Sequence, residues 1–261
     1  MTAPPRDPWG YLSDRTTARI GLGRAGASLP TNAVLSFALA HAKARDAVHA
    51  CLDRVALADG LATMGLATVM VESEAVERAL YLRRPDLGRR LNGSSRMRLA
   101  SCASGYDLAL AIGDGLSASA VNAHALTLIT AFVPFATRLG LTLGPITLAE
   151  GARVALGDEI GAALGARVVA VVIGERPGLS AADSLGVYLT YDPKPGRHDA
   201  ERNCISNIRP DGLSPEAAAS KLAWLIDAAL TRKLTGVALK DESDFLIADS
   251  QTIPEITANE G

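Results

Sequence analysis

Aromatic residues and cysteines are scarce in this chain of 261 residues. Only 4% of the residues are aromatic although 48% are hydrophobic, so alanine, valine and leucine must fill the core. The three cysteines, Cys51, Cys102 and Cys204, are odd in number, lie far apart and form no CxxC pair. This pattern indicates neither a disulfide framework nor a zinc site, and it favours a reducing, intracellular compartment.

A strong net charge and a membrane segment are also missing. The formal charge of −2 provides no general attraction to nucleic acid or to an anionic membrane. The N-terminus lacks the apolar run of a secretory signal. The uncharged segment 115–137 contains several polar residues and Pro134, which favours a buried helix over a membrane span. We therefore expect a soluble, cytoplasmic protein that binds neither nucleic acid nor membrane.

The common catalytic and metal-binding motifs are absent as well. The sequence contains no GxSxG elbow, no HExxH and no Walker A loop. His41 and His49 share one helix face but are separated by about 12 Å, which is too far for one metal ion. Gly21-Leu-Gly23-Arg-Ala-Gly26 matches the dinucleotide fingerprint GxGxxG, but no buried strand precedes it and no helix follows at once. We predict a glycine-rich loop there, no catalytic residue and no metal site.

What the chain does contain is an alternation of apolar strands with helical segments. Apolar runs predict strands at residues 108–112, 146–148, 168–173 and 187–191, and helical spacing predicts helices at 31–58, 74–82, 154–164 and 214–234, with a further helix after Ser117. Strands separated by such helices form parallel βαβ units. We therefore predict an α/β fold. An N-terminal arm and small helical domain (1–100) precedes a Rossmann-like parallel-sheet domain (101–261) with a polar C-terminal tail.

Three residues border the predicted strands where a ligand would be met. Six consecutive apolar residues, Val168–Ile173, predict a strand buried on both faces, and Glu175 stands in the turn that follows. Val154 opens the helix after the preceding strand, and Cys204 lies in a long polar loop at 192–212. Open α/β sheets bind ligands beyond the carboxyl ends of their strands, so we expect these three residues to converge on one crevice. Structural capping by Glu175 and core filling by Val154 and Cys204 are the alternative roles.

Six segments of the chain also match, in the same order, segments of a known family. They are Thr17-Ala-Arg-Ile-Gly-Leu-Gly-Arg-Ala-Gly26, Ala40-His-Ala-Lys-Ala-Arg-Asp-Ala-Val-His49, Arg84-Pro-Asp-Leu-Gly-Arg-Arg-Leu91, Arg153-Val-Ala-Leu-Gly-Asp158, Ile173-Gly-Glu-Arg-Pro-Gly178 and Cys204-Ile-Ser-Asn-Ile208. Through them the chain resembles the small (light) subunit of ethanolamine ammonia-lyase, an adenosylcobalamin-dependent lyase. The resemblance covers nearly the whole chain.

The resemblance implies a division of labour between two subunits. A large barrel subunit carries the radical chemistry that converts ethanolamine to acetaldehyde and ammonia, and the small subunit, inactive alone, closes the cobalamin site at the interface of a hetero-oligomer. Carried over by motif, the cofactor contacts are Val154, Glu175 and Cys204. The amide groups on the rim of a corrin ring suit a carboxylate acceptor such as Glu175. Packaging of the complex in a bacterial microcompartment is left open.

Two rival functions remain at this point. The chain could be a stand-alone nucleotide-binding enzyme on a Rossmann-like sheet, in which case the isolated chain has activity of its own. It could also be a scaffold that holds a partner and touches no cofactor. In that case, combined changes of Glu175 and Cys204 leave the assembled enzyme fully active.

Overall fold

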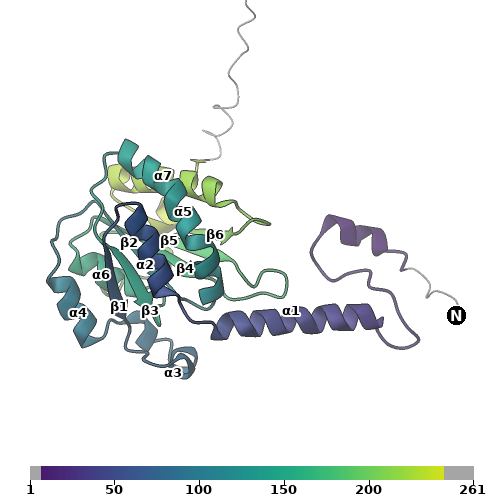
Figure 1. The fold of residues 1–261 in the computed structure, drawn as a ribbon. Helices are drawn as coiled ribbons and strands as arrows, with labels where there is room; N and C mark the ends of the chain where they lie inside the picture. Colours follow the sequence, from purple (N-terminus) through teal and green to yellow (C-terminus); the bar gives the residue numbers. More distant parts are fainter. Residues whose placement is uncertain (1–6, 244–261) are drawn as a thin grey trace, which may run out of the picture.

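The computed structural model describes residues 7–243, and its centre is one six-stranded sheet with the strand order β1-β3-β2-β4-β5-β6 (Figure 1). β1, β3, β2 and β4 run parallel, whereas β5 is antiparallel to β4 and β6 is antiparallel to β5. The strands are β1 (Thr68–Glu72), β2 (Leu108–Gly113), β3 (Ile146–Glu150), β4 (Val168–Gly174), β5 (Leu185–Tyr191) and β6 (Asn203–Ile208). The fold is thus α/β, with a mixed, mostly parallel sheet and N-terminal helices.

Helices cover both faces of this sheet. One face packs against α2 (Arg54–Thr63), α5 (Ala118–Arg138) and α7 (Pro215–Arg232). The other face packs against α4 (Gly93–Ala100) and α6 (Leu156–Ala163). Every residue of β2 and β4 is buried, which explains why the sequence of both strands is an unbroken apolar run. The remaining short elements are α3 (Arg78–Arg83) and the 3₁₀ turns η1 (Gly10–Arg15), η2 (Leu87–Arg89), η3 (Asp199–Glu201) and η4 (Gly236–Ala238).

Helix α5 is long and apolar enough to cross a membrane, yet it lies inside this fold. Its residues Leu128, Ile129 and Phe132 are fully buried in the core that α5 shares with α7 and the sheet. Pro134 stands within the helix and does not end it. The prediction of a buried helix over residues 115–137 is therefore confirmed.

Helix α1 (Thr31–His49) projects away from the sheet and its covering helices, and residues 7–30 fold back beside it (Figure 1). Ala47, near the carboxyl end of α1, is its only buried residue. Gly21, Gly23 and Gly26 all have positive φ angles, between 60° and 75°, in a segment without strand or helix. The glycine-rich stretch is therefore a loop, as predicted, and not a dinucleotide fingerprint.

Three strands correct the predicted parallel sheet. β5, predicted over 187–191 as a strand of a parallel sheet, runs antiparallel to β4. β1 lies within residues 1–100, so this part of the chain is not helical throughout, and its strand pairs with β3 in the same sheet. β6 lies in the segment 192–212, which the sequence pattern describes as a loop. Cys204 and Ser206 on β6 are exposed while Ile205 is buried, because no helix covers that face of β6. A strand that is half polar in this way resembles a loop in composition.

Helix boundaries differ from prediction in the first hundred residues. The helix predicted over 74–82 begins only at Arg78. The predicted continuous helix over 31–58 is divided into α1 and α2, because the carboxylate of Asp53 accepts a hydrogen bond from the backbone N–H of Ala56 and caps a new helix. Asn92 caps α4 in the same manner, in a stretch for which no helix is predicted. The helix start at Ser214 is confirmed, with Ser214 as cap and Pro215 in the first turn. The polar tail beyond residue 243 lies outside the described residues.

Candidate functional site

The loops after β2, β3 and β4 meet at the carboxyl edge of the parallel strands. The chain leaves β2 toward β3 on one side and returns to β4 on the other, so the crevice at this edge is a topological switch point of the kind that binds ligands in α/β sheets. The loops approach closely: a Cβ atom on Gly174 would lie 2.0 Å from the carbonyl oxygen of Ser117, and one on Gly115 would lie 2.2 Å from that of Gly174. Glycine is therefore required at both positions.

An open pocket of about 450 Å³ occupies this edge. Val154 and Glu175 both line it, together with Tyr81, Arg153 and Tyr188. Val154 lies in the turn that leads into α6, and Glu175 follows β4 directly. The structure therefore brings two of the three predicted site residues together in one pocket, although they come from different loops.

The carboxylate of Glu175 is held on one side only. Its Oε2 atom accepts a hydrogen bond from the hydroxyl of the buried Ser184 and one from the backbone N–H of Asn207, at 3.2 Å. No hydrogen bond to Oε1 occurs among residues 7–243. Gly186 makes room for this arrangement, since a Cβ atom there would lie 3.0 Å from Oε1. Glu175 is thus a fixed carboxylate with one free acceptor atom at the pocket.

Tyr81 and two arginines form the neighbouring wall. The Tyr81 ring is buried, its hydroxyl donates to the carbonyl of Ala152 at 3.0 Å, and the guanidinium groups of Arg78 and Arg153 lie 4.6 and 4.2 Å from the ring centroid. Arg78 also contacts the buried carboxylate of Asp114 at 3.2 Å. Burial raises the pKa of Asp114, and the backbone N–H of Ala152 and the charge of Arg78 oppose this effect. The Nε atom of Arg153 is buried without a hydrogen-bond partner.

Cys204 lies beside the pocket and not in the predicted loop. It stands on β6 directly opposite Tyr188 of β5, and Tyr188 lines the pocket. Desolvation, followed by the charge of Glu175, raises the pKa of the Cys204 thiol, and a hydrogen bond with Tyr188 opposes the rise. Burial and the Cys204 thiol likewise raise the pKa of Tyr188. Both groups are therefore neutral at pH 7, and Cys204 offers a thiol rather than a nucleophilic thiolate.

Several residues of this site carry no signal in the sequence. Tyr81 precedes the sheet edge by many residues and reaches it only because α3 packs beside the loop after β3. Ser184 sits in a polar turn and gains its role from the fold of that turn over Glu175. Arg153, in contrast, is next to Val154 and could have been included on position alone. Within residues 7–243, no three His, Cys, Asp or Glu side chains are grouped so that they could hold a metal ion.

Comparison with known proteins relates this geometry to a family. The family model for the ethanolamine ammonia-lyase light chain (EutC) matches residues 6–240. The chain is 57% identical to the ethanolamine ammonia-lyase small subunit of Bradyrhizobium diazoefficiens over 243 residues, which cover 92% of this chain and 93% of that protein. It is 59% identical to that of Rhodopseudomonas palustris, covering 87% and 88%, and 52% identical to that of Xanthomonas campestris pv. campestris, covering 96% and 94%.

These matches include the N-terminal residues 7–49, the sheet and the pocket. The relatives have nearly the same length as this chain. The resemblance noted from six sequence segments is therefore confirmed over the whole described structure. The chain belongs to the ethanolamine ammonia-lyase light chain family, the small subunits of a carbon–nitrogen lyase.

Proposed function

We propose that this chain forms one wall of the adenosylcobalamin site of an ethanolamine ammonia-lyase, and that the large subunit forms the opposite wall. The large subunit carries the conversion of ethanolamine to acetaldehyde and ammonia, and the small chain alone is inactive. The observation that carries this proposal is the pocket at the carboxyl edge, where Val154 and Glu175 lie together. When bound, the cofactor supplies the radical chemistry. This chain supplies binding, orientation and a wall against solvent.

The shape of the pocket supports a shared site. At about 450 Å³ and open to solvent, it is within the range of pockets for drug-sized ligands and too small to enclose a corrinoid. A corrinoid held here leaves most of its surface to a second protein. The pocket therefore suits a subunit that covers one side of the cofactor, and the small-subunit relatives imply a large-subunit partner for that other side.

The polar groups of the pocket suit the rim of a corrin ring. That rim carries neutral amide side chains, whose N–H groups donate hydrogen bonds and whose carbonyl oxygens accept them. The free Oε1 of Glu175 is an acceptor for an amide N–H, and Arg153 lines the same pocket. Val154 provides apolar contact beside them. Cys204 extends the same surface through Tyr188, and its neutral thiol suits a contact rather than a covalent bond.

Three further expectations are part of this proposal. The parallel strands with helices on both faces and a ligand crevice at the switch point support a Rossmann-like assignment for the sheet. A division of the chain near residue 100 stays a prediction, and any such division must accommodate the pairing of β1 with β3. A cytoplasmic location, with or without packaging in a microcompartment, is also a prediction.

The rival functions have less support from this geometry. A stand-alone nucleotide-binding enzyme would place a glycine-rich phosphate loop between a strand and a helix, whereas no strand occurs between residue 7 and Gly21–Gly26. Glu175 lines a pocket, its Oε2 atom accepts two hydrogen bonds and its Oε1 atom accepts none within residues 7–243. A scaffold without cofactor contact does not explain this arrangement.

The test is to titrate cobalamin into the complex of large and small subunits with Glu175→Ala. Losing one charge-assisted hydrogen bond should weaken cofactor affinity by roughly 1.5–3 kcal/mol, while assembly of the subunits is preserved. Glu77→Ala is the matched control, because Glu77 is exposed and caps no helix through its side chain. Unchanged cobalamin affinity in the Glu175 variant would contradict the proposal. Deaminase activity of the small chain alone would favour the stand-alone enzyme.

A further inference from the structure

The exposed apolar residues of this chain are concentrated in its first forty positions. Large hydrophobic side chains between one third and two thirds exposed occur throughout the segment of residues 7–49, which we call the arm. They are Trp9, Tyr11, Ile20, Leu22, Leu29, Val34, Leu35, Phe37 and Leu39. The sheet and its covering helices are more than four times longer than the arm and expose fewer such side chains. A monomeric protein rarely leaves so large an apolar patch in water.

The first half of α1 is apolar around most of its circumference. Val34 and Phe37 lie on one side, and Leu35 and Leu39 on another, since residues three or four apart share a face. The second half bears the charged residues Lys43, Arg45 and Asp46 in addition to its alanines. A helix that is apolar on all sides is normally buried. Within residues 7–243, the loop of residues 16–30 covers only part of the first half of α1, and the four large apolar side chains of that half stay between 48% and 63% exposed.

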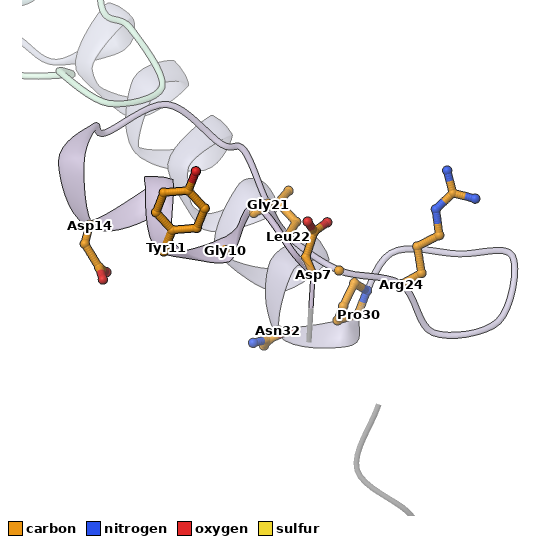
Figure 2. Close-up of a pocket in the computed structure, with 10 residues that line it drawn as sticks. Asp7, Gly10, Tyr11, Asp14, Gly21, Leu22, Arg24, Pro30 and Asn32 are labelled. Carbon is orange, nitrogen blue, oxygen red and sulfur yellow. The ribbon is translucent and has the colours of Figure 1, made fainter. Parts of the chain in front are cut away.

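The arm nevertheless has a defined shape of its own. The loop of residues 16–30 turns back beside α1, and the guanidinium group of Arg19 lies 5.8 Å from the centre of the Phe37 ring. Gly21 has a positive φ of 60°, and a Cβ atom there would lie 2.8 Å from the carbonyl oxygen of Trp9, so glycine is required. Between these segments is a hollow of about 550 Å³, with Tyr11, Leu22 and Arg24 around it (Figure 2). The arm therefore presents a preformed concave surface.

The arm is joined to the rim of the candidate cofactor pocket. Arg19 donates to the carbonyl of Leu179 at 3.1 Å, and Ser180 donates to the carbonyl of Thr17 at 3.4 Å. Leu179 and Ser180 belong to the turn that begins at Glu175. At the carboxyl end of α1, Arg78 donates to the carbonyl of Val48 at 2.7 Å, and Arg78 stacks on Tyr81 in the pocket wall. The arm is thus attached by hydrogen bonds to the turn that borders the pocket, and Leu39 of α1 lines a hollow together with Leu179 and Ser180 of that turn.

We propose that the arm is the docking element for the large subunit of the lyase, and that it receives an apolar surface of that subunit along the first half of α1 and the hollow in front of it. This inference rests on the proposed function, because it takes the pocket rim as the place where the large subunit arrives. A second copy of this chain is the less suitable occupant. A self-association through the arm would use the apolar surface at the rim and leave the open pocket beside it without its second wall.

The experiment compares two double variants in the full-length chain. Leu35→Asp with Leu39→Asp places charges on the apolar half of α1. Val55→Asp with Val237→Asp places the same charges on residues outside the arm that are more exposed still. The dissociation constant of each for the purified large subunit is measured by sedimentation velocity, with circular dichroism to check folding. The arm variant should bind at least thirtyfold more weakly than wild type, and the control variant should bind as wild type does. Leu35→Ser with Leu39→Ser gives a milder change if the aspartates impair folding.

Three outcomes would overturn the inference. Wild-type affinity of a folded arm variant shows that the arm does not dock the large subunit. Equal weakening by the control variant shows a general effect of added charge. A loss of self-association by the small chain, with unchanged affinity for the large subunit, assigns the arm to a second copy. The proposed function fails separately: if Glu175→Ala leaves cobalamin affinity unchanged while the arm variant still prevents assembly, the docking inference stands and the cofactor assignment falls.

Discussion

Large apolar side chains are exposed in the arm and buried in the sheet region. In β2 and β4 every side chain is buried between two layers of helices, and the strands need no other protein to cover them. In α1, nineteen residues long, a single alanine is buried. The comparison indicates that the free energy of folding comes mainly from residues 54–239, whereas residues 7–49 bury little apolar surface within this chain, as expected if the arm docks the large subunit. The pocket with Glu175 lies where these two regions join.

The ion pairs of the two regions also differ in burial. The guanidinium group of Arg202 is buried in the sheet region and makes two hydrogen bonds of 2.7 Å to the carboxylate of Asp158 on α6. A buried charge must be paired in this way to be tolerated. In the arm, the ion pair of Arg45 and Asp46 is exposed to solvent at 3.7 Å and contributes little.

The largest expected loss of stability comes from a substitution in the buried sheet region that leaves the arm unchanged. Arg202→Met leaves the buried carboxylate of Asp158 without its ion-pair partner and should lower the free energy of unfolding by about 3–5 kcal/mol. Chemical denaturation of the isolated chain measures it. Arg84→Met is the control, because Arg84 pairs with Asp86 at the surface and its loss should leave the unfolding midpoint near that of wild type. Equal effects of both variants would contradict the assignment of stability to the buried pair.

A smaller effect is expected where the loops of the pocket touch. Gly174→Ala places a Cβ atom 2.0 Å from the carbonyl oxygen of Ser117 and forces the two loops apart, which should cost about 1–3 kcal/mol of stability. It should weaken cobalamin binding by the assembled complex as well. Gly93→Ala serves as control, since a Cβ atom there meets no atom within 4 Å. A Gly174 variant with wild-type stability would show that the close approach is not required.

The smallest expected effect is on cobalamin affinity, and it concerns the hydrogen bond that holds Glu175 where the arm and the sheet region join. Ser184→Ala removes the hydroxyl that holds Oε2 of Glu175 and should weaken cobalamin binding about three- to tenfold, as expected for a lost hydrogen bond of about 0.5–1.5 kcal/mol. Assembly with the large subunit should be unaffected. Ser206→Ala, on the exposed face of β6, is the matched control. An unchanged affinity for Ser184→Ala would mean that Glu175 needs no positioning by this serine.

The sequence predicts the central strands well because burial on both faces leaves a clear pattern. Val168–Ile173 is unambiguous, and its place in a parallel sheet is enough to bring Val154 and Glu175 to one edge. β1 and β6 are missed for the opposite reason. β1 pairs on one side only at the end of the sheet order, and β6 alternates buried Ile205 with exposed polar residues. Edge strands of this kind have no distinctive apolar run.

The contacts within the site depend on tertiary structure that no local pattern carries. Tyr81 reaches the pocket through the position of α3, and Ser184 reaches Glu175 through the fold of a turn. Cys204 is predicted near Glu175 and lies near it, but on a strand opposite Tyr188 and not in a loop. The exposure of the arm is likewise invisible in its composition, because Val34, Leu35 and Phe37 would be as suitable for a core helix.

Hydrogen–deuterium exchange of the assembled complex, with and without adenosylcobalamin, tests the cofactor wall most directly. Binding should slow exchange at residues 151–155 and 174–177 and leave η4 unchanged, since Gly236 of η4 contacts Asn203 at the amino end of β6, away from the carboxyl edge. The arm should be slowed by assembly alone and should not respond further to the cofactor. Slowed exchange in η4 on cofactor binding, with no change at residues 174–177, would contradict the account.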